Sequence, residues 1–321
     1  MESTVDRQPS IQRIAMPAID EILGRKFSVL DDGFVRVMDY LGTDESIVEA
    51  ARVSYGRGTR PIHQDRGLIR YLMRHHHTTP FEMCEIKFHV RVPMHIWRQW
   101  IRHRTANVNE YSTRYSLAID SMQRTPSRRW RLQNSVNRQG SEGVLDEAVG
   151  STLSSKEHQL QESAREVYAD RIAKGVAREQ ARKDLPLSTY TEAYWKIDLW
   201  NLFHFLGLRM DQGAQQEIRD YAQTIGTHIV SKWVPLAWEA FQDYVLQAAH
   251  LSGLEVKIVG LLLNGNISGA QEQMRSYGWS ERQESGTQPK KNRERDEFFE
   301  KLERKFGASL SSLRILPDKH L

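Results

Sequence analysis

The regular alternation of apolar and polar side chains between Cys84 and Val92 constrains the fold of this chain more than any other stretch. Apolar residues occupy every second position there, and charged or polar residues occupy the positions between them. A strand with this period buries one face and leaves the other face polar. Pro93 closes the run and can occupy the first position of a helix, which we expect from Met94 to about His103. The sequence therefore predicts a sheet with one face packed on a core.

Helical periodicity dominates the rest of the chain, most clearly beyond residue 143. We expect one further strand between Asp31 and Gly42, and loops at 105–116 and in the basic stretch 121–143. The expected helices lie at about 45–53, 65–75, 146–174, 178–184, 189–207, 213–231 and 235–250. One strong strand among many helices favours the α+β class, with a small antiparallel sheet and segregated helices.

Three segments of different character divide the chain. Residues 1–27 lack a clear period, so we expect a loosely ordered N-terminal arm. Residues 28–250 hold the expected strands and most helices and should form one domain. Residues 251–321 should form a C-terminal extension with a polar linker at 280–297, which contains no large apolar residue. A short amphipathic helix should follow it, because Phe298, Leu302 and Phe306 recur every four residues.

Composition excludes several classes of protein. A chain of 321 residues with 8 Trp, 11 Tyr and 10 Phe can bury a core, so disorder of the whole chain is excluded. The longest clean apolar stretches are short, as in Ile258–Leu263, which rules out a membrane-spanning helix. The single Cys84 excludes an intrachain disulfide and a multi-cysteine metal site. Together with an N-terminus that lacks an apolar signal core, it leads us to expect a cytoplasmic protein.

Arginines gather at the end of the helix expected from Met94. Arg98 and Arg102 lie four residues apart, where like charges repel by roughly 0.2–0.5 kcal/mol. Arg104 and Arg114 add further positive charge, which a phosphate or carboxylate would relieve through the forked guanidinium groups. The alternative is a solvated basic face paired with nearby glutamates.

Polar residues in the following loop favour a binding site over a solvated face. Asn109, Glu110, Ser112 and Tyr115 lie among the arginines in a loop without apolar anchors. Polar loop residues at the end of a rigid helix are typical of functional sites. A nucleophilic role for Ser112 is not indicated, since no adjacent base or G-x-S-x-G context surrounds it.

The order of these residues resembles the signature of the flavin-dependent thymidylate synthases. Arg102-His103-Arg104 is followed after seven residues by Ser112, and the wider family pattern Arg-His-Arg…Asn-Glu-x-Ser-x-Arg-Tyr is also met. Asn107 departs from it, since many members have Ser there. Further stretches match in the same order, and the similarity covers roughly residues 30–250. These stretches are Ala51-Arg52-Val53-Ser54, His77-Thr78-Thr79-Pro80-Phe81-Glu82, Leu185-Pro186 and Leu206-Gly207-Leu208-Arg209.

The resemblance implies an enzyme of nucleotide biosynthesis whose catalytic domain spans residues 28–250. Its substrate would be deoxyuridylate (dUMP), methylated reductively to thymidylate (dTMP). 5,10-Methylenetetrahydrofolate would donate the carbon, NADPH the electrons, and FAD would relay the hydride. The family binds FAD between the subunits of a homotetramer, which agrees with the absence of a G-x-G-x-x-G motif. The stretch most similar to that motif, Gly56-Arg57-Gly58, lacks the third glycine and is interpreted as a turn.

The resemblance also implies site residues. Arg209 matches the arginine beside the uracil ring, where a fixed positive charge stabilises negative charge that develops on the base; the alternative is an ion pair with Asp211 or Glu217. The expected dUMP contacts are Gln99, Trp100, Ile101, Arg102, Glu110, Tyr111, Ser112, Thr113, Arg114, Arg182 and Arg209. The expected FAD contacts are Ser54, Thr79, Arg102, His103, Arg104, Glu110, Asp198, Leu199, Trp200 and His204.

Two weaker signals remain. Trp200 stands where relatives often carry His or Arg, and plain helix packing is an equal alternative for it. No metal site is expected, because the adjacent residues His75, His76 and His77 point in different directions on a helix.

A second class of function is a basic helical nucleic-acid-binding protein without catalysis. The stretch 98–138 would then supply positive charge, with Trp97, Trp100 and Trp130 as stacking platforms. We consider a nucleic-acid partner the weaker alternative, because nothing in such binding requires Asn109 and Glu110 among the arginines.

Overall fold

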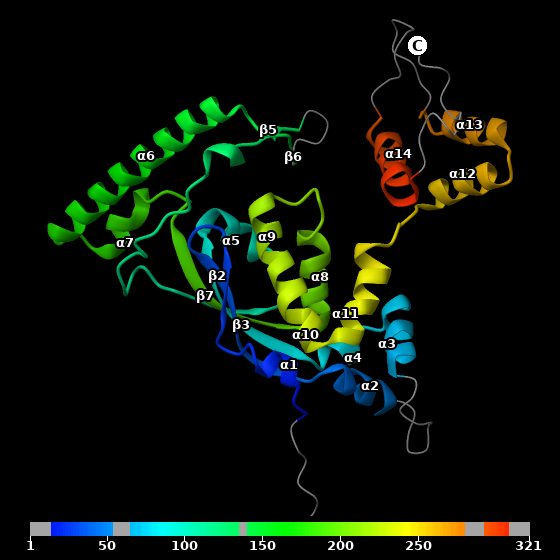
Figure 1. The fold of residues 1–321 in the computed structure, drawn as a ribbon, viewed down its shortest axis with the longest axis horizontal. Helices are drawn as coiled ribbons and strands as arrows, with labels where there is room; N and C mark the ends of the chain where they lie inside the picture. Colours follow the sequence, from blue (N-terminus) through cyan, green and yellow to red (C-terminus); the bar gives the residue numbers. More distant parts are fainter. Residues whose placement is uncertain (1–13, 54–64, 135–139, 280–291, 308–321) are drawn as a thin grey trace, which may run out of the picture. The chain divides into compact units, whose positions relative to one another are not determined.

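The computed structural model describes residues 14–53, 65–134, 140–279 and 292–307. The chain divides into two compact units, Met1–Leu246 and Gln247–Leu321. The first unit contains a five-stranded sheet and its helices, and the described part of the second unit consists of helices (Figure 1).

An antiparallel sheet in the order β1-β2-β3-β7-β4 organises the first unit. Its strands are β1 (Lys26–Val29), β2 (Gly33–Leu41), β3 (Glu85–Pro93), β7 (Tyr190–Asp198) and β4 (Asn107–Glu110). The alternation noted in the sequence corresponds to the central strand β3, which buries Phe88 and Val90 and leaves His89 half-buried on the other face. These elements confirm the expected α+β class.

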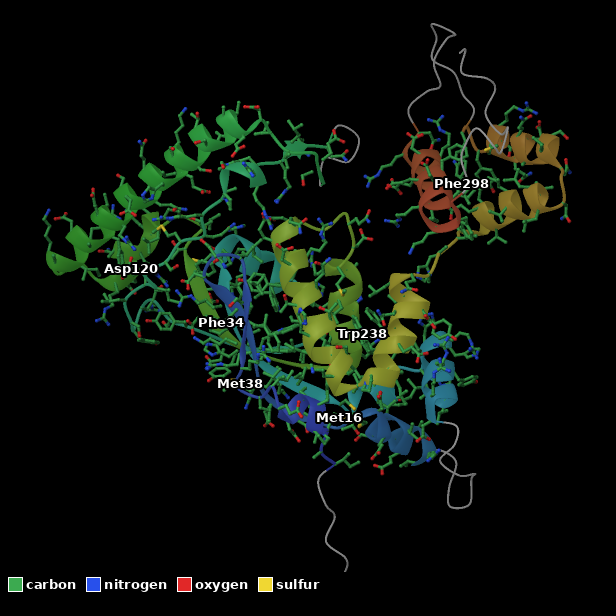
Figure 2. All side chains as sticks on the ribbon, in the orientation of Figure 1. Met16, Phe34, Met38, Asp120, Trp238 and Phe298 are labelled. Atoms are coloured by element: carbon green, nitrogen blue, oxygen red, sulfur yellow. The ribbon has the colours of Figure 1, made fainter. Side chains whose placement is uncertain are left out.

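The second strand contains one irregularity. The register with β3 shifts between Val37 and Asp39, so that Met38 has no partner in β3 (Figure 2 labels its position). A single extra residue of this kind bends a strand locally and increases its twist.

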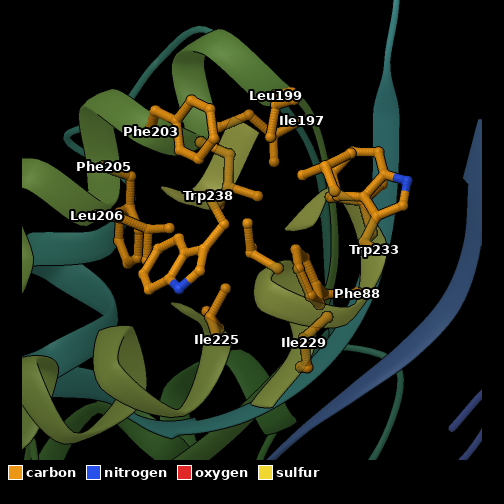
Figure 3. Close-up of a cluster of buried hydrophobic side chains, with 14 of the residues drawn as sticks. Phe88, Ile197, Leu199, Phe203, Phe205, Leu206, Ile225, Ile229, Trp233 and Trp238 are labelled. Carbon is orange, nitrogen blue, oxygen red and sulfur yellow. The ribbon is translucent and has the colours of Figure 1, made fainter. Parts of the chain in front are cut away.

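Helices cover one face of the sheet (Figure 1). They are α5 (Met94–Trp100), α8 (Leu199–Arg209), α9 (Gln216–Ile225), the π-helical segment η3 (Gly226–Val230), α10 (Ser231–Trp233), α11 (Pro235–Phe241) and the π-helical segment η4 (Gln242–Leu246). Their apolar side chains meet those of β3 and β7 in a continuous core, part of which Figure 3 shows around Phe88, Ile197 and Trp238. Phe203 stacks on Phe241 with ring centroids 4.4 Å apart.

Shorter elements complete the first unit. They are α1 (Pro17–Asp20), α2 (Asp44–Val53), α3 (Asp65–Arg74), α4 (Thr79–Glu82), η1 (Ser127–Arg129), β5 (Leu132–Gln133), β6 (Ser141–Glu142), α6 (Glu147–Ala173), α7 (Arg178–Ala181) and η2 (Arg182–Asp184). The long helix α6 packs against η1, where Gly150 allows close approach: a Cβ at this position would lie 2.0 Å from the Ser127 carbonyl oxygen.

The second unit has its own small core. Its helices are α12 (Gly253–Leu263), α13 (Ile267–Ser276) and α14 (Arg293–Phe306). Trp279 and Phe298 lie with ring centroids 5.5 Å apart in that core, and Leu302 joins them. Ser252 and Glu255 form a capping box at the start of α12. The helix expected around Phe298 is confirmed, but Phe306 at its end is 58% exposed.

Five expectations are wrong. The stretch 121–143, expected to be a loop, contains η1, β5 and β6, and the linker expected at 280–297 ends earlier, because α14 begins at Arg293. Residues 190–198 form strand β7 rather than helix, since Ala193, Trp195 and Ile197 alternate with polar side chains and pair with β3. Residues 107–110 form edge strand β4 rather than loop, because they pair with β7. The N-terminal arm is not loose where the structure describes it, from Ile14 on, because Ile19 and Ile22 are buried in the core; residues 1–13 lie outside the described ranges.

Among the described helices, none is both long and apolar enough to cross a bilayer.

Candidate active site

A cavity of about 550 Å³ opens where the chain leaving α5 meets α8. Its walls come from the turn after α5, from the end of β7 and from one side of α8. The lining residues are Arg102, His103, Arg104, Thr105, Ile197, Asn201, His204, Leu208 and Arg209. Seven of these nine residues carry a polar or charged side chain, and three are arginines.

The position of this cavity is fixed by the aromatic core beneath it. Trp100, the last residue of α5, is fully buried, with its ring 5.1 Å from Trp195, 4.9 Å from Phe205 and 5.7 Å from Tyr221. Aromatic pairs of this kind contribute about 0.5–1.5 kcal/mol each beyond the area they bury. The turn that begins at Ile101 is therefore anchored, and the basic residues that follow it are held against α8.

Arg209 ends α8 and points its guanidinium toward the turn after α5. Its Nε donates to Nε2 of His103 at 3.0 Å, and its Nη2 donates to the carbonyl oxygen of Gln99 at 3.4 Å. Both acceptors are neutral groups. Arg209 has no carboxylate partner among the described residues, so its positive charge is not compensated by the protein there.

The alternative ion pairs for Arg209 are not formed. Glu217 instead pairs with Arg131 at 2.7 Å and also accepts a hydrogen bond from Gln215. Asp211 accepts the backbone N–H of Gly213 at 2.8 Å. The carboxylates near Arg209 in the sequence are thus engaged elsewhere.

Burial shifts the protonation of this pair. It lowers the pKa of His103 to about 4, with smaller contributions from the positive charge of Arg209 and from His204. Burial also lowers the pKa of Arg209 from its ordinary value, although a guanidinium remains charged at neutral pH. At pH 7 the site therefore presents a cationic arginine beside a neutral imidazole.

Arg102 and Arg104 reach the cavity from the turn as exposed side chains. Across the described ranges, neither guanidinium has a hydrogen bond or an ion pair. Guanidinium groups without a protein partner suit phosphate oxygens, which they bind through two parallel hydrogen bonds. The solvated basic face paired with glutamates, the alternative from the sequence, is not what the structure shows for these two residues.

The expected nucleotide contacts form two groups in the structure. One group lies around strand β4 and the loop that follows it. Oε1 of Glu110 accepts a hydrogen bond from Thr191 at 2.9 Å. Arg182 donates to Oγ1 of Thr113 at 2.5 Å, and Arg114 pairs with Glu179 at 3.1 Å. Glu110 and Tyr111 also line a separate cavity of about 310 Å³. Ser112 is half-buried, and its Oγ accepts the backbone N–H of Arg114 at 3.3 Å.

The other group of expected nucleotide contacts lies at the cavity of about 550 Å³. Arg102 and Arg209 line it, and Gln99 joins them through its carbonyl oxygen. Ile101 is half-buried at the start of the turn. The side chain of Trp100 is enclosed in the core, so Trp100 can meet a ligand only through its backbone.

The expected flavin contacts are also divided. Arg102, His103, Arg104 and His204 line the cavity together. Thr79 is exposed at the start of α4, and Trp200 packs on Phe81 of the same helix with centroids 5.7 Å apart.

The remaining flavin candidates have structural roles or lie outside the described ranges. Asp198 is the N-cap of α8: its carboxylate accepts the backbone N–H of Asn201 at 3.0 Å and the Asn201 amide at 2.7 Å. Leu199 is fully buried, and its N–H donates to the carbonyl oxygen of Cys84. Ser54 lies outside the described residues.

Four lining residues were not predicted from the sequence, namely Thr105, Ile197, Asn201 and Leu208. A signal for two of them existed, because Asn201, His204 and Leu208 fall at positions i, i+3 and i+7 on one face of α8. The erroneous helix over 189–207 obscured where that face begins.

Two of the three stacking platforms of the nucleic-acid alternative are not available. Trp97 and Trp100 are 2% and 0% exposed, so neither can stack on a base. Nε1 of Trp130 donates to Ser154 on α6 at 3.0 Å, and that ring is half-buried. Within the described ranges, no group of three or more His, Cys, Asp or Glu residues is arranged to hold a metal ion.

The fold and the cavity define a class of protein: an α+β unit whose cavity is lined by three arginines without a carboxylate partner in the described part of the chain, next to the imidazole of His103. Residues 36–236 match the family described as thymidylate synthase complementing protein. The chain belongs to this family.

Similar proteins agree with that assignment. A flavin-dependent thymidylate synthase of Wolbachia pipientis wMel is 48% identical over 271 residues, covering 84% of this chain and 95% of the relative. One of Rickettsia conorii is 46% identical over 287 residues, covering 84% and 96%. Among solved structures, a UMP/dUMP methylase of Streptomyces cacaoi bound with 5-Br dUMP matches with a TM-score of 0.61 and 31% identity, covering 68% of this chain and 98% of that one.

Proposed function

We propose that this protein methylates dUMP to dTMP as an FAD-dependent enzyme, with 5,10-methylenetetrahydrofolate as carbon donor and NADPH as reductant. The observation that carries the proposal is the guanidinium of Arg209, which no carboxylate of the described residues pairs with, in a cavity with Arg102 and Arg104. The relatives named flavin-dependent thymidylate synthase support it, because they align with this chain over nearly their whole length.

The residues of the cavity fit a flavin nucleotide. Arg102 and Arg104 offer guanidinium groups for its phosphates, while His103 and His204 offer flat rings with centroids 5.8 Å apart. When bound, FAD carries hydride between the nicotinamide and the pyrimidine. Thr79, Trp200 and Ser54 would complete its contacts. Asp198 and Leu199 would act through the position of α8, because their own polar groups are engaged within the protein.

Arg209 would serve the pyrimidine. Negative charge develops on the base when a nucleophilic carbon forms, and a fixed cation in a partly dry cavity stabilises that charge more strongly than in water. Oriented groups of the protein suffice for this role, so no protein nucleophile is needed.

The remaining nucleotide contacts would divide between the two groups of residues. Gln99, Trp100 and Ile101 would contribute backbone groups beside Arg102. Glu110, Tyr111, Ser112, Thr113, Arg114 and Arg182 would surround the phosphate and the sugar from the β4 side. Ser112 and Arg114 offer the hydroxyl and the guanidinium that a phosphate dianion requires.

The absorbance spectrum of the purified protein, followed by an assay of dTMP formation, tests this function. We expect flavin absorbance that changes when dUMP is added. Arg209→Ala should retain the flavin and lose at least 100-fold in rate, on the order of the loss of one charge-stabilising group. Arg219→Ala is the matched control, because the guanidinium of Arg219 on α9 donates to Gln212 and Gln216 and does not line the cavity. A colourless protein, or full activity of Arg209→Ala, would contradict the proposal.

We also propose a homotetramer with the flavin held between subunits. The division of the expected contacts between two regions of one chain supports a shared site. Light scattering should give four times the mass of one chain, and a monomer that turns over dUMP would refute the arrangement. The cytoplasmic location stays a prediction, and RNA binding that falls steeply with salt would favour the nucleic-acid alternative.

A further inference from the structure

Arg209 is held by two neutral acceptors rather than by a carboxylate. A guanidinium has five N–H donors. In Arg209, Nε–H bonds to His103 and one Nη2–H points to the Gln99 carbonyl oxygen. Both Nη1 protons and the second Nη2 proton have no acceptor in the described part of the chain. The two bonds orient the guanidinium plane and leave one edge for a ligand.

The bond to His103 determines the tautomer of its ring. Nε2 can accept from Arg209 only when it carries no proton, so the proton of the neutral imidazole resides on Nδ1. A doubly protonated ring would turn this acceptor into a donor and would place two like charges 3.0 Å apart. Burial acts in the same direction, since it lowers the pKa of His103 to about 4.

The core fixes the ring of His103 in this position. Its backbone N–H donates to the carbonyl oxygen of Trp100 at 3.0 Å, and Trp100 is fully buried. The ring stands edge-on to Phe205, with centroids 4.9 Å apart, and Phe205 lies one helical turn before Arg209 on α8. The same helix thus supports both members of the pair.

We propose that His103 is a positioning residue for the nucleotide: its neutral imidazole accepts the Nε–H of Arg209 and so aims the Nη edge of that arginine at the pyrimidine of dUMP. This inference rests on the proposed function and assigns to His103 a task separate from flavin contact. A carboxylate in the place of His103 would hold Arg209 equally well but would neutralise its positive charge. That positive charge is needed to stabilise the negative charge that develops on the base. An imidazole orients the cation and leaves that charge available.

Calorimetric titration of the flavin-loaded protein with dUMP tests the proposal. The amide oxygen of glutamine reaches about as far as Nε2 of histidine, whereas that of asparagine reaches only about as far as Nδ1. His103→Gln should therefore keep the dissociation constant for dUMP within about threefold. His103→Asn, the matched control, and His103→Ala should each weaken binding about tenfold or more, the loss expected for a hydrogen bond to a charged group. Equal binding by the Gln and Asn variants would overturn the proposal.

A double-mutant cycle separates positioning from direct contact. If His103 acts through Arg209, adding His103→Ala to Arg209→Ala should weaken dUMP binding by less than about twofold further. Additive losses would show that His103 contacts the ligand on its own account and would refute the inference alone. Wild-type protein that fails to bind dUMP would contradict this proposal and the proposed function together. Flavin absorbance is compared among the variants, so that lost cofactor is not mistaken for lost positioning.

Nitrogen-15 spectroscopy of labelled histidine gives a second readout that needs no variant to bind ligand. The signal that disappears in His103→Gln identifies His103. We expect the Nδ1–H tautomer at pH 7, and an Nε2–H tautomer would exclude the bond from Arg209.

Discussion

Asp44 is a buried carboxylate of the first unit, and the fold disfavours its ionised form. Its two oxygens accept the backbone N–H groups of Leu236 and Ala237 at 2.8 and 3.0 Å, and so satisfy donors at the start of α11. Burial nevertheless raises its pKa to about 6 from 3.8, since desolvation of the charge outweighs the lowering by those two hydrogen bonds. The same burial, together with Asp44, raises the pKa of the packed thiol of Cys84 to about 12.

Asp44→Asn should alter how stability depends on pH. The folded state holds the Asp44 proton more tightly than the unfolded state, so the free energy of unfolding gains from Asp44 at low pH and loses that gain as pH rises from about 4 to 6. The variant has no such group. Urea unfolding at pH 4, 5, 6 and 7 should show the wild type losing stability relative to Asp44→Asn over this range. A constant difference would show that Asp44 titrates normally.

Single residues also mark the limit of sequence inference at the site. Arg209 could be singled out only through the family pattern, because Asp211 and Glu217 nearby offered equally good partners. Neither residue pairs with Arg209 in the structure. Glu217 pairs with Arg131, which is distant in the sequence, and Asp211 accepts the backbone N–H of Gly213. Contacts of that kind depend on tertiary packing, which local spacing does not record.

At the scale of elements, the junction of β7 and α8 shows why the prediction of 189–207 failed. Apolar residues alternate with polar ones through Trp195, Ile197 and Leu199, with no glycine or proline between strand and helix. The change from a period of two to a period near 3.6 occurs at Asp198, whose N-cap bond to Asn201 starts the helix. An N-cap that occupies one of the polar positions of an alternating stretch is a weak signal.

Asp198→Ala should destabilise α8 rather than abolish flavin binding directly. Loss of an N-cap of this kind costs about 1 kcal/mol, and Asp198→Asn should recover most of it. Thermal unfolding should shift down by about 2–4 °C in a unit of this size. An unchanged melting temperature with loss of flavin absorbance would instead make Asp198 a direct cofactor contact.

Gly150→Ala should loosen α6 from η1. The added Cβ would lie 2.0 Å from the Ser127 carbonyl oxygen, so the helix must shift, at a cost of about 1–3 kcal/mol. Hydrogen exchange should increase in α6 and η1 and stay unchanged in β3. Gly67→Ala in α3 is the control, because a Cβ there would meet no atom within 4 Å apart from the surrounding backbone of its own helix. Equal exchange in both variants would refute the close packing.

At the scale of the whole molecule, the chain holds two separate cores. The α+β class could be predicted from β3 and the helices. The five-stranded sheet could not, because β1 and β4 each have four residues, too few for alternation to emerge. Helices α12 and α13 also escaped prediction: α12 is apolar around most of its circumference and so lacks an amphipathic period.

Phe298→Ala should unfold the second unit alone. Removing a buried phenylalanine costs about 3–5 kcal/mol, comparable to the whole stability of a small helical unit. Limited proteolysis should then cut beyond residue 247, while dUMP binding persists because the site residues lie in the first unit. Phe306→Ala, at a position 58% exposed, is the control and should resist cleavage like the wild type. Loss of dUMP binding in Phe298→Ala would show that the units depend on each other.

The buried ring of Trp100 has a consequence for the lifetime of the site. The turn that carries Arg102 and His103 directly follows Trp100, which packs on Trp195 and Phe205 in the aromatic cluster. Segments rooted in a packed core open only when that core opens, whereas surface loops fray long before. On heating, the protein should thus lose ligand binding and the folded sheet in a single transition. No species with a folded sheet and a non-binding site should be populated.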